Sequence, residues 1–461
     1  MRFFRHVLST FLAEIAIVGL NLLLGVLTAR VLGPERRGIL ALVMTLPVTL
    51  VTFADLGISR ANIYLIGRRG RSPQQIASNA LFFALATGAF LGLGLWPVRG
   101  LALRTLLRGL PARYLALILV LTPFLLLYTH WLAILRAFQR FELFNLIRLL
   151  MPLSLLGMMG AALLVFHGGI GWATAAYGAG VLLAVGISLA IVGAITRPRL
   201  RFDRSLAGEA MAYGLKSYLQ NLVSHLTYRL DLYLVAYFLS PREVAFYAIA
   251  TSAAELAWYI PNSVGLVLFP KLSATEEERI HPLTAEISRH TLLITLLAAG
   301  VVLLAGGVGI PLLYGADYRP AVGPMVILMP GVATMALYKV LSRNFSSRNR
   351  QEVSIAAAAL GLALDVLLNV IFIPRLRVMG AALASTIAYS LAALVLLEAF
   401  RRESGLSREA VLRLRQDDLQ RYAELVATVR AVLGRWPTAD GRWPTADGRR
   451  PTADRRWPTV D

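Results

Sequence analysis

The stretch LALDVLLNVIFIP, residues 362–374, decides how this chain is interpreted. Eleven of its thirteen residues suit the hydrocarbon core of a membrane, but Asp365 and Asn369 do not. The two polar residues are four apart, so a helix places them on one face. Two interpretations are open: the pair is satisfied by packing against a neighbouring helix, or it contacts a coupling ion or the substrate.

Apolar stretches of this kind recur along the whole chain. Of its 461 residues, 57% are hydrophobic and only 16% are charged, whereas a soluble protein is about one quarter charged. We therefore predict an all-α polytopic membrane protein, with twelve transmembrane helices. The predicted spans are 7–31, 38–64, 75–97, 113–135, 143–166, 171–195, 210–239, 243–268, 288–313, 321–342, 352–373 and 378–399.

The composition argues against several kinds of chemistry. The chain has no cysteine, and its six histidines show no metal-ligand spacing. We find no glycine-rich phosphate loop and no nucleophile triad in the sequence. No catalytic residue, metal site or cofactor is therefore predicted. The basic and then apolar N-terminus is expected to be the first span, retained in the mature protein, because its apolar part is too long for a signal peptide.

The formal net charge of +20 comes mainly from arginines between the apolar stretches. Such loops set membrane topology and meet anionic lipid head groups, so we expect membrane lipids as partners and no nucleic acid. With the N-terminus inside, the inner loops carry about twice as many Arg and Lys residues as the outer loops. We predict a multi-pass protein of the bacterial cytoplasmic (inner) membrane, with both termini cytoplasmic.

The chain also contains a weak internal repeat. At a shift of 207 residues, ARVLGPERRGILAL (29–42) aligns with AYFLSPREVAFYAI (236–249), and Arg136 falls on Arg343. This predicts two six-helix lobes, residues 1–200 and 205–402. Because six is even, the lobes share one orientation and are related by a pseudo-two-fold axis along the membrane normal. Secondary transporters of this kind hold the substrate between the halves.

The composition changes after residue 402. Residues 403–433 are predicted to form a cytoplasmic amphipathic helix, and 434–461 contain four copies of a seven-residue GRWPTAD-like repeat. A proline in every copy rules out a coiled coil. The tail is predicted to be disordered, with contact to the lipid surface or a partner as the alternative.

Polar residues form stripes on four of the predicted spans, at about 100° per residue. The seventh span has two adjacent rows, and the first, second and eighth spans have one each. The rows contain Lys216, Gln220, Ser224, Thr227 and Asp231; Asn221, His225 and Arg229; Thr10, Glu14, Asn21 and Thr28; Thr45, Thr49, Thr52, Asp55 and Asn62; and Thr251, Glu255 and Asn262.

Charged residues in such rows are expected to face a cavity, since charge in lipid costs about 2.5–3.5 kcal/mol. The Ser and Thr residues can equally well serve helix packing. Four cations are left with two interpretations, because they can line the cavity or extend toward the membrane surface. These are Arg60, Arg148, Lys339 and Arg343.

Three segments resemble the lipid-linked oligosaccharide flippases. They are LTARVLGPERRGILALVMTLPVTLVTFADLGIS (27–59), YRLDLYLVAYFLSPREVAFYAIAT (228–251) and LDVLLNVIFIPRLRVMGAALAST (364–386). These flippases form the polysaccharide, or O-antigen (Wzx-like), branch of the multidrug/oligosaccharidyl-lipid/polysaccharide (MOP) exporter superfamily. The resemblance covers residues 1–402. It departs at Asp365, where family members often carry asparagine.

The resemblance implies two lobes around a central cavity lined by the first, second, seventh and eighth helices. It also implies that the protein moves a polyprenyl-pyrophosphate oligosaccharide outward for cell-surface polysaccharide or lipopolysaccharide synthesis, together with a polysaccharide polymerase and glycosyltransferases. On this basis the candidate substrate residues are Lys216, Arg229, Asn221, His225, Gln220, Asn21 and Asn262. The candidates for coupling a proton or sodium ion are Glu14, Asp55, Asp231, Glu255 and Asp365.

Two functions other than that of a flippase are also considered for this sequence. A drug or cation antiporter of the same superfamily requires an acidic cavity, and Lys216 and Arg229 argue against it. A membrane-embedded glycan-lipid enzyme usually has a sizeable outer loop and a compact catalytic cluster, and the sequence predicts neither.

Overall fold

The computed structural model describes residues 2–105, 107–199, 201–273, 275–416 and 418. For residues 2–8, 216, 217, 266, 267, 269, 270 and 273, only the helical path is described. Every regular element within these ranges is a helix. The elements are α1 (Arg2–Ala54), α2 (Ile58–Gly67), α3 (Pro73–Leu95), α4 (Arg99–Arg104), α5 (Ala112–Ala137), α6 (Phe141–Gly160), the π-helical η1 (Ala161–Val165), α7 (Ile170–Thr196), α8 (Arg204–Phe238), α9 (Pro241–Ala254), the 3-10 helix η2 (Glu255–Trp258), α10 (Tyr259–Ser273), α11 (Glu277–Tyr314), the 3-10 helix η3 (Ala316–Ala321), α12 (Val322–Ser347), α13 (Gln351–Leu376), α14 (Val378–Ser404) and α15 (Arg408–Leu412).

Among the described residues, nine helices are long and apolar enough to cross a membrane. The prediction of a helical multi-pass membrane protein is therefore confirmed, while the number of twelve crossings stays a prediction. One of the nine, Ser9–Ala54 in α1, covers most of the first predicted span and the larger part of the second. Gly33, with φ 71° and ψ 170°, interrupts the helical backbone at the predicted boundary between them.

Two of the predicted spans are broken in the structure. The second, 38–64, breaks where α1 ends at Ala54 and α2 begins at Ile58. Gly57 in this break has φ 79°, and a Cβ there would lie 2.1 Å from the carbonyl oxygen of Gly214 on α8. Only glycine permits both this backbone conformation and this approach. The eighth span, 243–268, is divided by η2, which begins at Glu255.

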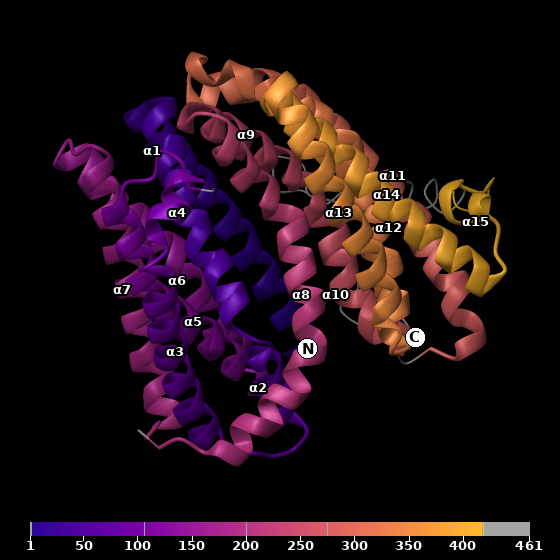
Figure 1. Ribbon diagram of the computed structural model, residues 1–461. Coiled ribbons are helices and arrows are strands. Elements are labelled where there is room, and N and C mark those ends of the chain that lie inside the picture. Colours follow the sequence, from indigo (N-terminus) through magenta and orange to yellow (C-terminus); the bar gives the residue numbers. More distant parts are fainter. Residues whose placement is uncertain (1, 106, 200, 274, 417, 419–461) are drawn as a thin grey trace, which may run out of the picture.

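The helices form two groups (Figure 1). Helices α1–α7 lie on one side, α9–α14 lie on the other, and α8 runs between them. Within the first group α5 packs against α1, α2, α3 and α7, and within the second α12 packs against α9, α10, α11 and α14. The predicted boundary at 200–205 falls where α7 has ended, at Thr196, and α8 begins, at Arg204. The two-fold symmetry of the groups stays a prediction.

At the end of the molecule where α1 meets α9 in Figure 1, the two groups are in close contact. A Cβ at Gly38 would lie 1.7 Å from the carbonyl oxygen of Pro241, so the helices touch through their backbones. Pro241 is held in place by the capping box of α9, formed by Ser240 and Glu243. Arg30 adds a hydrogen bond from its Nε to the carbonyl oxygen of Leu313, at 2.7 Å.

The segment after α14 folds back onto α11. Arg289 on α11 makes two hydrogen bonds to Asp418, at 2.5 and 3.0 Å, and both side chains are buried. The short helix α15 of this segment packs against α11, with Ala410 and Val411 buried. About half of the predicted amphipathic helix 403–433, residues 417 and 419–433, falls outside the described residues, and the tail 434–461 lies entirely outside them.

Candidate functional site

Two carboxylates in the C-terminal half share one hydroxyl group. Asp231 on α8 and Asp365 on α13 are 2% and 1% exposed. The Oγ of Ser385 on α14 lies 3.3 Å from Oδ2 of Asp231 and 3.2 Å from Oδ1 of Asp365. Because a serine hydroxyl carries a single proton, it can donate to only one carboxylate at a time.

Tyr247 and Asn369 complete this site. Tyr247 on α9 donates its hydroxyl to Oδ2 of Asp231 at 2.5 Å, and the Nδ2 of Asn369 donates to the backbone oxygen of Asp365 at 2.8 Å. In the part of the chain that the structure describes, Oδ2 of Asp365 and Oδ1 of Asn369 are buried without a hydrogen-bond partner. We call Asp231, Tyr247, Asp365, Asn369 and Ser385 the carboxylate cluster.

The chemistry of the carboxylate cluster follows from its burial. Two carboxylates removed from water and close together cannot both stay charged unless a cation lies between them. Otherwise one of them holds a proton. Carboxylate, amide and hydroxyl oxygens are the ligands that hard cations prefer. The carboxylate cluster can therefore hold a proton or a small hard cation.

Arg229 and Glu255 form a bidentate ion pair. The Nη1 and Nη2 of Arg229 lie 2.7 and 3.1 Å from the two carboxylate oxygens of Glu255. Arg229 was predicted as a substrate contact and Glu255 as an ion contact, but in this conformation each neutralises the other. A substrate anion would bind Arg229 only beside this pair or after breaking it.

Asn262 meets a cation that the sequence left with two interpretations. The Nζ of Lys339 on α12 donates to Oδ1 of Asn262 at 2.9 Å. The same ammonium lies 4.5 Å from the ring centroid of Trp258 and 5.0 Å from that of Tyr228, at cation–π distance. Lys339 is therefore held inside the C-terminal half rather than extended to the membrane surface.

In the N-terminal half, Asp55 lies in the break between α1 and α2. It accepts hydrogen bonds from the backbone nitrogen of Ser59 at 3.1 Å and the hydroxyl of Ser59 at 2.9 Å. The fully buried His130 of α5 has its Nδ1 4.0 Å from Asp55 and 3.4 Å from the amide of Asn62. Asp55 therefore binds a backbone N–H in the first turn of α2 as well as facing a histidine.

Glu14 is also paired. Its carboxylate lies 2.8 Å from the Nη2 of Arg148 on α6. One turn away, Thr10 accepts a hydrogen bond from Asn145 at 3.0 Å. This part of the predicted stripe of α1 thus contacts α6, within its own half.

The seventh-span row does bridge the two halves. The Nε2 of His225 lies 2.8 Å from the hydroxyl of Thr49 on α1, and Thr49 is also 2.7 Å from the hydroxyl of Tyr233. Asn221 accepts from Arg60 of α2 at 3.4 Å. At this point the polar rows of the second and seventh predicted spans therefore face each other.

The other predicted residues are placed differently. Asn21 is exposed on α1, and Gln220 is half-buried on α8. The side chain of Lys216 lies outside what the structure describes. The proposed roles of these three residues stay predictions.

Four arginines from both halves gather within electrostatic range of one another. The positive charges of Arg60 on α2 and Arg343 on α12 repel each other. The charge of Arg136 on α5 is repelled by those of Arg60 and Arg148. We call these four residues the arginine group. Arg60, Arg136 and Arg343 are exposed. With Asp55 and Glu14 as acidic neighbours, the group keeps an excess of two positive charges.

Sequence reasoning missed some of these residues. Ser385 and Tyr247 were overlooked because a single hydroxyl in an apolar helix carries little information. Arg136 lies in none of the polar rows, but the internal repeat aligns it with Arg343, which is a signal for a shared position. Both arginines belong to the arginine group.

Solved structures share this fold. The chain resembles the lipid II flippase MurJ in an inward closed conformation, with a TM-score of 0.70 and 16% identity over 86% of this chain and 87% of MurJ. It resembles a multidrug resistance MATE family transporter of the MOP superfamily in an inward-facing conformation, with a TM-score of 0.66 and 16% identity over 84% of this chain and 94% of that one. The fold is that of MOP superfamily transporters.

The family follows from the sequence. The profile described as "Polysaccharide biosynthesis protein" matches residues 27–323, so the chain belongs to this family. The probable low-salt glycan biosynthesis flippase Agl15 of Haloferax volcanii is 23% identical over 400 residues, which cover 84% of this chain and 81% of Agl15. These relatives are named as flippases and transporters, which confirms the expectation of a transporter rather than an enzyme.

Proposed function

We propose that this protein is a flippase that moves a polyprenyl-pyrophosphate-linked oligosaccharide from the cytoplasmic to the outer leaflet, for cell-surface polysaccharide synthesis. The observation that carries the proposal is the arginine group. Guanidinium groups bind pyrophosphate oxygens through planar, charge-assisted hydrogen bonds. Arg60 and Arg343 come from opposite halves and repel each other, and a pyrophosphate bound near them would offset that repulsion. A transporter of organic cations has no use for such an excess of positive charge.

The polar rows supply contacts for the sugar. Thr49, His225 and Asn221 lie where α1, α2 and α8 face one another. Hydroxyl, imidazole and amide groups both donate and accept hydrogen bonds, as sugar hydroxyls require. In this proposal the pyrophosphate binds at the arginine group and the glycan extends along these rows, while the polyprenyl chain stays in lipid.

The carboxylate cluster is proposed as the coupling site. A proton or sodium ion bound there removes the repulsion between Asp231 and Asp365, and so changes how α8 packs on α13 and α14. Helix α8 also carries Arg229 and His225, so this change in packing reaches the residues proposed to contact the substrate. Alternating access then requires the contact of Gly38 with Pro241 to open when the halves rock.

This role implies a place for the protein in the cell. The substrate would be assembled by glycosyltransferases on the inner face of the cytoplasmic membrane. A polysaccharide polymerase or ligase would use it on the outer face. The predicted cytoplasmic position of both termini belongs to the same proposal.

The proposal is tested with purified protein in proteoliposomes. A polyprenyl-pyrophosphate oligosaccharide is placed in one leaflet, and its exposure in the other is followed with and without a proton or sodium gradient. We expect protein-dependent exposure that falls in the Arg60→Gln/Arg343→Gln variant. The Arg375→Gln variant is the matched control, because Arg375 is exposed at the end of α13 and donates to the carbonyl of Ile371.

One observation favours a second candidate, a cation-coupled antiporter for drugs or other solutes. The carboxylate cluster offers buried negative charge, which a cationic solute can also use. In that case the glycan lipid stays in its leaflet, and an imposed gradient drives uptake of a soluble cation that depends on Asp231 and Asp365. The arginine group is then irrelevant to transport.

A further inference from the structure

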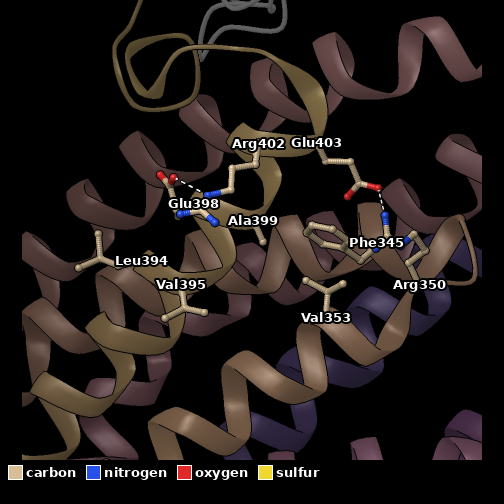
Figure 2. A pocket seen from close by; sticks show the side chains of 9 residues that line it. All are labelled: Phe345, Arg350, Val353, Leu394, Val395, Glu398, Ala399, Arg402 and Glu403. Carbon is tan, nitrogen blue, oxygen red and sulfur yellow. Dashed lines mark hydrogen bonds and ion pairs between the residues drawn. The ribbon is translucent and has the colours of Figure 1, made fainter.

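A groove lies at the end of the C-terminal half, and its lining includes no residue of the carboxylate cluster or the arginine group. It has a volume of about 670 Å³ and is lined by the last turns of α12, the first turns of α13 and the second half of α14. Figure 2 shows the apolar side chains of Phe345, Val353 and Val395 along it and charged side chains at one end. The groove therefore has an apolar length and an ionic end.

The apolar part of the groove is short. Along α14 the groove extends from Leu394, which is 61% exposed, to Glu403, and its apolar side chains on this helix are Leu394, Val395 and Ala399. Leu394 and Ala399 lie about 7.5 Å apart along the helix, about a quarter of a hydrocarbon core of about 30 Å. Both α13 and α14 are apolar enough to cross a membrane. The apolar length thus lies at acyl-chain depth, with its ionic end near the head groups.

The ionic end carries excess positive charge. Two glutamates of α14 each bind several arginines, and Glu352 also binds Arg350. The pairs are Arg348 and Arg350 with Glu403, Arg350 with Glu352, and Arg401, Arg402 and Arg408 with Glu398. Five arginines against three glutamates leave an excess of two positive charges.

The glutamates hold the arginines in place without covering them. Arg402 contacts Glu398 through its Nε at 3.0 Å, yet its side chain is 75% exposed. Arg350 is 50% exposed while it contacts Glu403. Each guanidinium has five donors, so a bound carboxylate leaves donors that can face an incoming anion. Figure 2 places Arg402 and Arg350 on the two flanks of the groove.

We propose that this groove binds an anionic phospholipid of the surrounding membrane. The phosphate contacts Arg350 and Arg402, and one acyl chain lies along Leu394 and Val395. Basic pockets between membrane helices take lipid head groups in this way. The proposal goes beyond the flippase function, because this lipid is a bound component and not the cargo. It would brace α13 against α14, the helices that carry Asp365 and Ser385.

The test uses the full-length chain and native mass spectrometry, with phosphatidylglycerol as the anionic probe and phosphatidylcholine as the zwitterionic one. We expect phosphatidylglycerol to be retained about thirtyfold more strongly, since both arginines favour an anionic lipid at a membrane surface. Arg350→Gln/Arg402→Gln should abolish this preference. Arg350→Lys/Arg402→Lys should keep most of it and shows whether the fold tolerates the changes.

Two further variants separate the acyl chain from the head group. Ala399→Trp fills the groove without removing charge, and it should weaken retention of both lipids. Arg375→Gln removes an arginine at the other end of α13 and should change nothing. Unchanged phosphatidylglycerol retention in the Gln double variant overturns the proposal. So does displacement by inorganic phosphate in excess, which would mark a site for free anions only. Neither outcome bears on whether the protein flips glycan lipids.

Discussion

The two halves of the molecule treat their buried carboxylates differently. In the N-terminal half, Asp55 accepts two hydrogen bonds from Ser59 and faces His130, and Glu14 is paired with Arg148. In the C-terminal half, Asp231 and Asp365 compete for the single hydroxyl proton of Ser385. The first arrangement gives each acid its own partner, whereas the second brings two buried acids together and leaves Oδ2 of Asp365 without a donor, although Asp231 accepts from Tyr247 and from the backbone nitrogen of Leu232.

This difference assigns different roles to residues that look alike in the sequence. A carboxylate with its own donors is stable in its charged form and has no need of an ion. Two buried carboxylates that share a hydroxyl, one of them with an oxygen that lacks a donor, leave the structure with a free-energy cost that a proton or cation removes. The sequence predicts five acidic residues as ion-coupling candidates. Of these, Asp231 and Asp365 are the two that lie together, so we propose them as the ion site. The predictions below test that choice.

The largest effect is expected from the carboxylate cluster. Asp231→Asn and Asp365→Asn keep the size of each side chain and remove the charge that attracts the ion. We predict about a hundredfold loss of gradient-driven flipping, the upper part of the usual range of coupling free energies of 1–3 kcal/mol. The measurement is flipping in proteoliposomes with and without the gradient.

The matched control for this prediction lies in the other half. Asp55→Asn makes the same chemical change in a residue with its own donors, and it should leave the response to the gradient within about twofold of wild type. If Asp55→Asn removes the response to the gradient and Asp365→Asn keeps it, the ion site lies in the N-terminal half and not at the carboxylate cluster.

The next effect concerns the arginine group. Arg60→Gln/Arg343→Gln removes one cation from each half, and charge-assisted hydrogen bonds contribute about 1.5–3 kcal/mol each. We predict a loss of at least about tenfold in flipping, together with weaker binding of the glycan lipid. Binding is measured with the purified protein. Normal binding and flipping in this variant would remove the pyrophosphate role from the arginines.

A single substitution sharpens the comparison further. Ser385→Ala deletes the hydroxyl that the two acids share but keeps both charges. We predict a loss of about three- to tenfold in the apparent affinity for the coupling ion, since one ligand is lost. The maximal flipping rate should stay close to that of wild type. Titration of flipping against sodium or proton concentration separates the two quantities, and an unchanged affinity would exclude Ser385 from the ion site.

The sequence predicted the helical membrane architecture and the polar faces, because hydropathy and helical periodicity are local properties. It placed Asp365 and Asn369 on one face, and both are buried as a pair. The rows of the second and seventh spans, which it predicted as polar faces, do meet through Thr49 and His225.

What the sequence could not predict depends on which helices pack together. Tyr247 and Ser385 are 138 residues apart, and only the packing of α9 and α14 around α8 brings both to Asp231. The pairing of Arg229 with Glu255 likewise depends on the break of the eighth span at η2. No local pattern in the sequence reveals such a partner.

The smallest effect concerns a carboxylate outside the membrane spans. Hydrogen bonds from Arg289 hold the pKa of Asp418 below its ordinary value. A lowered pKa stabilises the folded state above the unfolded pKa of about 4, and this stabilisation is lost as pH falls through the folded value. We predict that residues 405–418 stay docked from neutral pH down to about pH 4 and become sensitive to proteolysis only in stronger acid.

Asp418→Asn supplies the comparison for that prediction. The variant lacks the charge that Arg289 binds, so its C-terminal segment should be cleaved at neutral pH as well. Wild-type protein that is cleaved equally at every pH would show that the Arg289–Asp418 pair does not hold this segment.

The most direct measurement is glycan-lipid flipping in proteoliposomes under an imposed sodium or proton gradient, for wild type, Asp231→Asn and Asp55→Asn side by side. We predict gradient-driven flipping in wild type and in Asp55→Asn, and its loss in Asp231→Asn. Gradient-driven flipping that survives in Asp231→Asn, or that disappears only in Asp55→Asn, would contradict an ion site in the C-terminal half.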